Sequence, residues 1–328
     1  MKIWYDACTG KHVRYGSAIA KKLRKNGHEM IMTTRRHPDT LPMIKYLGEE
    51  FLPVGKYDPR NLSSRLKESL RRQLLFIKIF ERNLPDLAVS HGSVDQCRVA
   101  FGLAKPVVST VDTPYAVAVH KLTLPLTRYI VASKAIPQET LRHYNAEAEM
   151  VNFDGVDEVA WIKNFTPETT YDFGEPLIVV RQLEEKAAYA NTRVNMLALA
   201  KKLTKLGKVV FLSRYERKRI KDLIIPEGFI DSASLSAQAD LFVGVGGTIT
   251  REAALRGTPA IVVDLFSGQY VNGFLAEKGF PIFRTAASEV MAVAKKEIGK
   301  KRDVKAKLEK LQNPVDVIAD IVKKLDKK

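Results

Sequence analysis

Hydrophobic positions fall into two alternating kinds of run along the chain. Short, β-rich apolar runs are separated by stretches whose apolar residues recur at helical spacing. This alternation is typical of βα units built around parallel sheets. In the first half the predicted strands are Lys2–Asp6, Glu29–Thr33, Leu87–Ser90, Val107–Val111 and Tyr129–Ala132. The predicted helices are Ser17–Lys25, Leu62–Arg82 and Val94–Phe101.

The second half begins a new series of the same kind. Its predicted strands are Leu177–Val180, Val209–Leu212, Leu241–Val243 and Ala260–Val263. Its predicted helices are Thr192–Lys205, Thr250–Arg256, Asn272–Lys278, Ser288–Leu311 and Val315–Lys324. Between the halves, a segment with prolines, a glycine and several threonines shows no helical period and reads as a linker.

These patterns predict an α/β protein with two Rossmann-like, doubly wound domains that face a central cleft. We place the N-terminal domain at 1–165, the linker at 166–176 and the C-terminal domain, with the last helices, at 177–328. Ligands bind beyond the carboxyl ends of strands in open parallel sheets, so the loops after the strands are where chemistry is expected.

Length and composition agree with this organisation. The chain has 328 residues, of which 45% are hydrophobic and 27% charged, and a chain of this length usually forms domains of about 150 residues. No apolar run reaches the roughly 20 residues of a membrane-spanning helix, and Met1 leads directly into a strand rather than a secretory signal. Two cysteines, Cys8 and Cys97, point to a reducing compartment, so we expect a cytoplasmic protein.

The charge favours a polyanionic partner. Lys and Arg number 53 against 37 Asp and Glu, a formal net charge of +16. Nucleic acid, an anionic membrane face and a phosphorylated substrate all suit such a field. Zinc-finger and RNA-recognition signatures are missing from the sequence, so charge alone does not make nucleic acid the leading partner.

The most informative segment is the glycine-rich turn after the predicted strand at 241–243. It carries Gly244, Gly246 and Gly247, and a helix opens at about Thr248. Glycines at a strand end let a phosphate approach the backbone, and a helix N-terminus offers free N–H groups and partial positive charge. Glu252, one turn into the helix, can accept hydrogen bonds from ribose hydroxyls.

A second candidate site follows the first strand. There Thr9-Gly10-Lys11-His12 forms a predicted loop, with a helix starting near Tyr15. His12 is the favoured general base, because imidazole titrates near neutrality. Asp6 ends the first strand, and His91 and Asp112 follow other strands of the same sheet, so we expect all three to point into one crevice. Asp112 acts as a base, orients one or, as we expect, caps a turn.

The glycine turn resembles the donor-nucleotide motif of two-domain (GT-B fold) glycosyltransferases. In that family a glycine-rich turn is followed by a ribose-binding glutamate and then Gly-x-Pro, matched here by Glu252 and Gly257-Thr-Pro259. The segment is similar to the bacterial N-acetylglucosaminyltransferase of peptidoglycan synthesis, and the similarity continues into Gln269-Tyr-Val-Asn272. It implies that Glu252 binds the ribose and Gln269 the donor sugar. In GT-B proteins the last helix often returns to the first domain, which is an alternative placement for Val315–Leu325 here. Those transferases carry Thr-Gly-Gly-His-Val after the first strand, where Lys11 here replaces the second glycine.

Over nearly its whole length the chain resembles a mainly archaeal family known only as domain of unknown function 354. The matching features include the opening strand with its His-Val, Ser90-His-Gly-Ser93, Val111-Asp-Thr113 and the glycine turn. Arg181 and Arg214, in two further matching strand ends, are candidates to clamp a pyrophosphate.

The sequence contains no Asp-x-Asp pair, with which single-domain transferases hold a divalent metal, and no zinc-ligand spacing. We therefore expect no metal and no cofactor. The charge of a leaving nucleoside diphosphate would be stabilised by a helix N-terminus and arginines.

The predicted helix at 62–82 is amphipathic and basic. Leu66, Leu70, Leu74 and Ile77 recur at helical spacing, with arginines and lysines around them. We expect the apolar stripe to pack on the sheet with the cations solvated. The alternative is a helix that lies on anionic lipid.

The leading hypothesis is a metal-independent glycosyltransferase that moves a sugar from a nucleotide-sugar donor to a lipid-linked or glycan acceptor. In it Gly10, Lys11 and His91 bind the acceptor, and His12 and Asp112 are catalytic. One alternative is an enzyme like UDP-N-acetylglucosamine 2-epimerase, which resembles the glycine-turn segment, although the Gly-Thr-Arg-Pro-Glu of that family is missing here. Another is a non-catalytic protein that binds nucleotide-sugars or polyanions.

Overall fold

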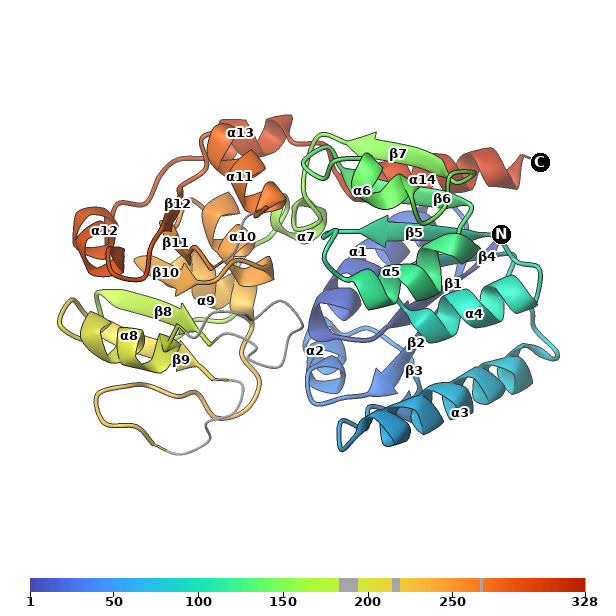
Figure 1. The fold of residues 1–328 in the computed structure, drawn as a ribbon, viewed down its shortest axis with the longest axis horizontal. Coiled ribbons are helices and arrows are strands. Elements are labelled where there is room, and N and C mark those ends of the chain that lie inside the picture. The colour runs from blue at the N-terminus through green and yellow to red at the C-terminus, as the bar shows by residue number, and fades with distance from the viewer. Residues whose placement is uncertain (183–193, 214–218, 266–267, 328) are drawn as a thin grey trace. The chain divides into compact units, whose positions relative to one another are not determined.

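The computed structural model describes residues 1–182, 194–213, 219–265 and 268–327 (Figure 1). It divides into two compact units. The first unit contains Met1–Trp161 and the segment from Gln312 onward, and the second contains Ile162–Leu311. Each unit has its own parallel sheet with flanking helices, so the predicted α/β class with two Rossmann-like units is confirmed.

The first unit is built on a sheet of seven strands, counted over the described residues, in the order β3-β2-β1-β4-β5-β6-β7. Every neighbouring pair is parallel. The chain order reverses between β1 and β4, which makes their carboxyl ends the switch point where doubly wound sheets bind ligands. The strands are β1 (Lys2–Ala7), β2 (Glu29–Arg36), β3 (Leu52–Lys56), β4 (Leu87–Ser90), β5 (Val107–Val111), β6 (Tyr129–Ser133) and β7 (Glu149–Phe153).

Helices cover this sheet and position its loops. α1 packs on α2 and on α14, while α3 packs on β3 and α4. The helices of this unit are α1 (Gly10–Lys25), α2 (Thr40–Leu47), α3 (Leu62–Phe80), α4 (Val94–Gly102), α5 (Val117–Thr123), α6 (Glu139–Arg142) and α14 (Pro314–Asp326). α7 (Val159–Ile162) spans the residue at which the chain passes into the second unit. In the part of the chain that the structure describes, no helix is both long and apolar enough to cross a bilayer.

Among its described residues, the second unit has a five-stranded parallel sheet in the order β12-β11-β10-β8-β9. Its strands are β8 (Leu177–Arg181), β9 (Lys208–Leu212), β10 (Leu241–Gly244), β11 (Ala260–Val263) and β12 (Ile282–Thr285). Its helices are α8 (Met196–Leu203), α9 (Ser232–Gln238), α10 (Thr248–Leu255), α11 (Tyr270–Glu277), α12 (Val290–Glu297) and α13 (Lys305–Lys310). The central strand β10 carries the glycine turn at its carboxyl end.

Three edge-side strands, β3, β7 and β12, were not predicted. Each is only partly buried, so none gives the continuous apolar run that marks a strand covered on both faces. The single helix expected at 288–311 is two helices, because Gly299 adopts a left-handed conformation (φ +74°) between α12 and α13.

The domain division differs from the expected one at its ends. The segment expected to be a linker, 166–176, belongs to the second unit. The last helix, α14, belongs to the first unit rather than the second, because its buried side packs against α1 and β6. That side includes Val315, Ile318 and Val322.

A buried ion cluster anchors α3 to the first sheet. The Arg72 side chain is 2% exposed and donates hydrogen bonds to Asp6 (2.8 and 3.0 Å), Asp95 (2.6 Å) and the Val54 carbonyl (2.8 Å). Gly55 lets the side chain pass, since a Cβ there would lie 2.4 Å from Arg72 Cγ. One guanidinium thus joins β1, β3, α3 and α4.

Replacing Arg72 by methionine should destabilise the first unit strongly. The change leaves the buried Asp6 and Asp95 carboxylates without their cation, which costs about 3–5 kcal/mol in the free energy of unfolding. Urea unfolding measures the loss. Arg71→Met, at the exposed neighbouring position, is the control and should change stability by less than about 0.5 kcal/mol. A loss for Arg72→Met no larger than the control's would contradict a structural role for this cluster.

Candidate functional site

The carboxyl ends of β1, β4 and β5 bring together residues that the sequence singled out. α1 begins at Gly10, and the Thr9 hydroxyl caps it by accepting a hydrogen bond from the His12 N–H (3.4 Å). The expected loop of Gly10, Lys11 and His12 is therefore wrong in its conformation: these residues form the first turn of a helix. The helical turn fixes the direction in which the side chains of Lys11 and His12 point.

Lys11 forms the centre of a charged cluster. Its ammonium lies 2.5 Å from Asp112 Oδ2 and 3.0 Å from Asp157 Oδ2. Asp157 is 4% exposed, follows β7 and was not predicted from the sequence. The signal that could have found it is its place after β7, a strand that the hydrophobic pattern does not predict.

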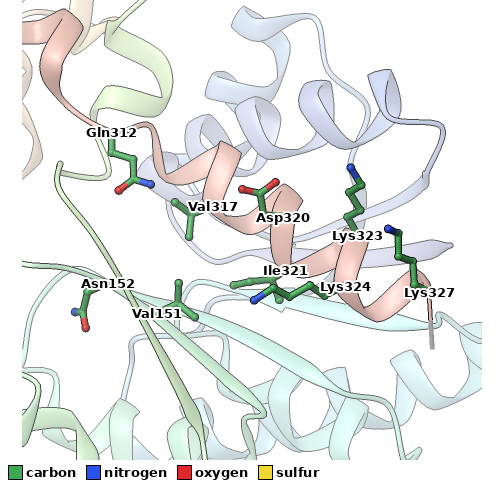
Figure 2. A pocket seen from close by; sticks show the side chains of 9 residues that line it. All are labelled: Val151, Asn152, Gln312, Val317, Asp320, Ile321, Lys323, Lys324 and Lys327. Atoms are coloured by element: carbon green, nitrogen blue, oxygen red, sulfur yellow. The ribbon is translucent and has the colours of Figure 1, made fainter.

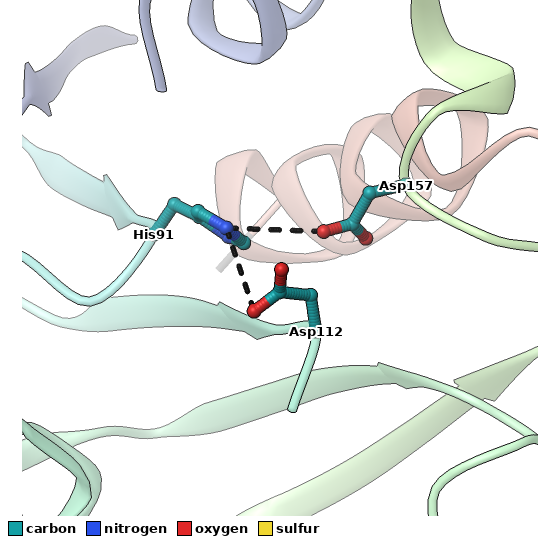
Figure 3. Close-up of side chains that lie close together, drawn as sticks. All are labelled: His91, Asp112 and Asp157. Atoms are coloured by element: carbon teal, nitrogen blue, oxygen red, sulfur yellow. Dashed lines mark ion pairs between the residues drawn. The ribbon is translucent and has the colours of Figure 1, made fainter. Parts of the chain in front are cut away.

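His91 completes the cluster (Figure 3). Its Nε2 lies 3.9 Å from Asp112 Oδ1 and 3.8 Å from Asp157 Oδ2, and its Nδ1 is 2.6 Å from the Thr110 hydroxyl. His91, Asp112 and Asp157 are close enough together to ligate a metal ion. The ammonium of Lys11, however, already contacts both carboxylates and compensates their charge. We therefore describe the four side chains as an acid–base cluster.

Exposure distinguishes the members of this cluster. The Asp112 side chain is 28% exposed, whereas those of Asp157 and His91 are 3% and 5% exposed. Asp112 is thus the carboxylate that a substrate can reach. Lys11 and His91 are less exposed and lie 2.5 and 3.9 Å from the Asp112 carboxylate.

His12 lies beside the cluster. Its ring packs edge-on to that of His91, with 4.7 Å between ring centroids. Burial, followed by the nearby His91 and Lys11, lowers the pKa of His12 well below its ordinary value of 6.5. Its Nδ1 accepts a hydrogen bond from the Cys8 N–H (3.4 Å), which leaves the proton of the neutral ring on Nε2. This hydrogen bond occupies the lone pair that a base would use.

Tyr15 is a neighbour of the cluster that sequence reasoning did not identify as functional. It is fully buried, and its hydroxyl has no hydrogen-bond partner among the described residues. Its ring lies edge-on to His91 at 5.4 Å. Burial and then the Asp157 carboxylate raise the pKa of Tyr15 well above 10, so the hydroxyl stays protonated.

In the second unit, the glycine turn opens the N-terminus of α10. Gly246 (φ +95°) and Gly247 (φ +102°) both adopt backbone conformations that favour glycine. A Cβ on Gly246 would also lie 2.4 Å from Gln269 Oε1. Gly247 is the N-cap of α10 and provides no side chain to cap it, so the first N–H groups from Thr248 onward are left for another acceptor.

Gln269 supports this turn from the start of α11. It is 8% exposed, and its Nε2 donates to the Val245 carbonyl (3.0 Å) while its Oε1 accepts from Asn272 Nδ2 (2.5 Å). These contacts hold the backbone of the glycine turn. Contact between Gln269 and a donor sugar stays a prediction.

Glu252 is buried on α10. It is 1% exposed and accepts a hydrogen bond from the Ser232 hydroxyl (2.7 Å), which comes from the first turn of α9. Thr250 Oγ1, in the first turn of α10 and also buried, has no hydrogen-bond partner among the described residues. Gly244 ends β10, and a Cβ there would lie 2.9 Å from the Phe242 ring, so the strand end is closely packed.

Of the two predicted arginines, the structure describes Arg181. Arg181 ends β8, is partly buried and donates from Nη1 to the Leu212 carbonyl at the end of β9 (3.3 Å). It therefore lies at the carboxyl edge of the sheet that also bears the glycine turn. Arg214 lies outside the described residues.

A separate hollow of about 450 Å³ lies between α14 and β7 (Figure 2). None of the predicted site residues lines it. It is bordered by apolar side chains, by lysines and by other polar side chains, which include Val151, Val317, Lys324, Asn152 and Asp320.

The family described as "Protein of unknown function (DUF354)" matches residues 1–327. The chain belongs to this DUF354 family. A relative, the uncharacterized protein MJ0665 of Methanocaldococcus jannaschii, is 28% identical over 342 residues and covers 98% of each chain. The DUF354 resemblance drawn from the sequence is thus confirmed.

Solved structures share the fold of the whole DUF354 chain. The UDP-GlcNAc 2-epimerase of M. jannaschii, in complex with UDP-GlcNAc and UDP, matches with a TM-score of 0.71 at 15% identity, covering 98% of this chain and 99% of that one. The glycosyltransferase SsfS6 of Streptomyces sp. SF2575, complexed with thymidine diphosphate, matches with a TM-score of 0.60 at 18% identity and covers 98% and 99%. The expected GT-B-like fold class is confirmed by these structures.

The neutral state of His12 predicts how stability depends on pH. The unfolded chain takes up this proton near pH 6.5, and the folded chain does so only at lower pH. Protonation therefore favours unfolding, and the free energy of unfolding falls as the pH drops below about 6.5. Denaturant unfolding as a function of pH should show a shallower fall for His12→Asn. His143→Asn, at an exposed histidine, is the control, and equal slopes for both variants and the unmodified chain would refute the prediction.

Proposed function

We propose that this DUF354 protein binds a nucleotide-sugar through its second unit and transfers the sugar to an acceptor hydroxyl. The observation that carries the proposal is the turn through Gly246 and Gly247, which presents the uncapped N-terminus of α10 at the carboxyl end of β10. Free N–H groups and the helix dipole at such a position suit a diphosphate. Solved structures of the same fold carry UDP-GlcNAc, UDP or thymidine diphosphate.

Other residues of the second unit suit the rest of a nucleotide. Glu252, whose carboxylate accepts a hydrogen bond from Ser232, is the proposed ribose contact of this unit. Arg181 offers a guanidinium at the same edge of the sheet for phosphate oxygens. Together with the helix N-terminus, this cation would stabilise the charge that develops on the leaving diphosphate.

The first unit supplies the proton chemistry in this proposal. The acceptor oxygen attacks the anomeric carbon, the bond from that carbon to the diphosphate oxygen breaks, and the hydroxyl proton passes to Asp112. Lys11 contacts the same carboxylate and holds it in place. Asp112 is the proposed base because its side chain is more exposed than those of Asp157 and His91. His12 is not chosen, because its Nδ1 already accepts a hydrogen bond from the Cys8 N–H.

A second candidate, 2-epimerisation of a nucleotide-sugar, is favoured by the number of acid–base groups. Two carboxylates, an imidazole and an ammonium lie within one cluster, and inverting a carbon of the sugar needs proton removal and return rather than an acceptor. One assay distinguishes the two functions. An epimerase changes UDP-GlcNAc alone, while a transferase releases the nucleotide only when an acceptor is present.

Thermal unfolding against UDP-, GDP-, ADP- and dTDP-sugars tests donor binding. A ligand at about 100 times its Kd adds about 2.7 kcal/mol to the free energy of unfolding, so one nucleotide should raise the Tm. Glu252→Gln should reduce or abolish the shift, and Glu227→Gln, an exposed glutamate of the same unit, should leave it unchanged. No shift with any nucleotide in folded protein would refute donor binding.

Asp112→Asn tests the proposed base once a donor is known. Loss of the proton acceptor should lower kcat by about 10²–10⁴-fold with little change in the KM for the donor. Steady-state kinetics of nucleotide release measure both constants. Asp320→Asn, at an exposed position on α14, is the matched control. A variant with unchanged kcat would assign the proton transfer to another residue.

A further inference from the structure

Helix α3 presents a row of large apolar side chains to solvent. The row consists of Leu62, Leu66, Leu70, Leu74 and Ile77, which are between 43% and 79% exposed. The expectation that this stripe packs on the sheet is wrong. Arg72, Phe76 and Phe80 take the inward side instead, where both phenylalanine rings contact Trp4 edge-on at 4.7 and 4.6 Å.

A row of cations runs beside this apolar row. Lys67, Arg71 and Lys78 are exposed, and each follows a residue of the apolar row by one position. Because consecutive helical residues are offset by the same rotation, the three cations lie along one side of the row. Arg71 lies 3.7 Å from Glu68 on the same helix, and because its own side chain is 65% exposed the cation still faces water.

The helix is placed at the margin of its unit. It lies along one edge of the first unit, packed on β3 and α4 through its inward side (Figure 1). With 19 residues it is about 28 Å long at 1.5 Å per residue, so the apolar row forms a continuous strip and not scattered exposed leucines.

We propose that α3 docks this protein on the surface of an anionic lipid bilayer. The helix lies in the plane of the interface, with the leucine row at the boundary of headgroups and acyl chains and the cationic row on lipid phosphates. The net charge of +16 adds long-range attraction to such a surface. This inference concerns α3 alone and does not depend on the proposed function.

Other occupants use only part of this surface. A nucleic acid would neutralise the cations but leave the leucines in water. A second copy of the chain, packed on the same helix in antiparallel fashion, would cover the leucines but bring the two cationic rows to the same side. An anionic bilayer would take the leucine row out of water and pair the cationic row with lipid phosphates at the same time.

Sedimentation of the full chain with lipid vesicles tests the proposal. Binding to phosphatidylcholine vesicles that contain phosphatidylglycerol should exceed binding to pure phosphatidylcholine and should weaken with salt. Leu70→Gln/Leu74→Gln should lower the partition coefficient by about tenfold or more, because the apolar contact is lost. Leu122→Gln, an equally exposed leucine on α5, should have no effect.

The cationic row has its own test. Lys67→Gln/Lys78→Gln should weaken binding to the anionic vesicles by about fivefold for each lysine and should reduce the dependence on salt. Both double variants change exposed positions only, so the Tm of each should match that of the unmodified chain.

Three results would overturn the proposal. The first is absence of binding to anionic vesicles at low salt. The second is binding that the leucine variant retains in full, which would show a purely electrostatic contact such as nucleic acid makes. The third is self-association in the absence of lipid that the leucine variant abolishes, which would assign the row to a second copy.

Discussion

The first unit depends on one buried guanidinium, that of Arg72. Burying a charge is unfavourable unless it is paired and hydrogen-bonded, and Arg72 meets both conditions through Asp6, Asp95 and the Val54 carbonyl. Ser93 and Thr33 donate to the remaining positions on Asp6. Because Asp6 lies in β1 and Ser93 is the N-cap of α4, the cluster fixes the ends of the two strands at the switch point, from which the candidate site is built.

The same arrangement explains why α3 faces water with its leucines. Arg72, Phe76 and Phe80 lie on one side of the helix, and the ion cluster commits that side to the sheet. The guanidinium also lies over the Phe76 ring, with 5.0 Å to its centroid. Once this side is buried, the spacing of Leu66, Leu70 and Leu74 places them on the opposite part of the helix surface. The core of the first unit and the proposed lipid-binding face are thus two consequences of one orientation.

The two candidate sites are built differently. In the first unit, charged side chains from separate strands converge, and Lys11 compensates two carboxylates that would otherwise repel each other. In the second unit, backbone groups form the candidate site. Two glycines with positive φ precede a helix N-terminus, and hydrogen bonds of Gln269 with Val245 and Asn272 hold the turn. A side-chain cluster suits proton transfer, and a backbone anion site suits a diphosphate.

The sequence by itself determined the strands that are buried on both faces, the two-unit α/β organisation, the glycine turn and the DUF354 membership. Each of these follows from local apolar runs or from contiguous motifs. It also located His91 and Asp112 directly after strands, and Lys11 in the segment after the first strand, although not its helical conformation. Only the tertiary structure decided that Asp157 and Tyr15 join them, that α14 packs with the first unit and that the leucines of α3 face outward. These features depend on contacts between residues far apart in the chain, and helical periodicity identifies the apolar side of a helix without telling whether that side or a buried arginine meets the sheet.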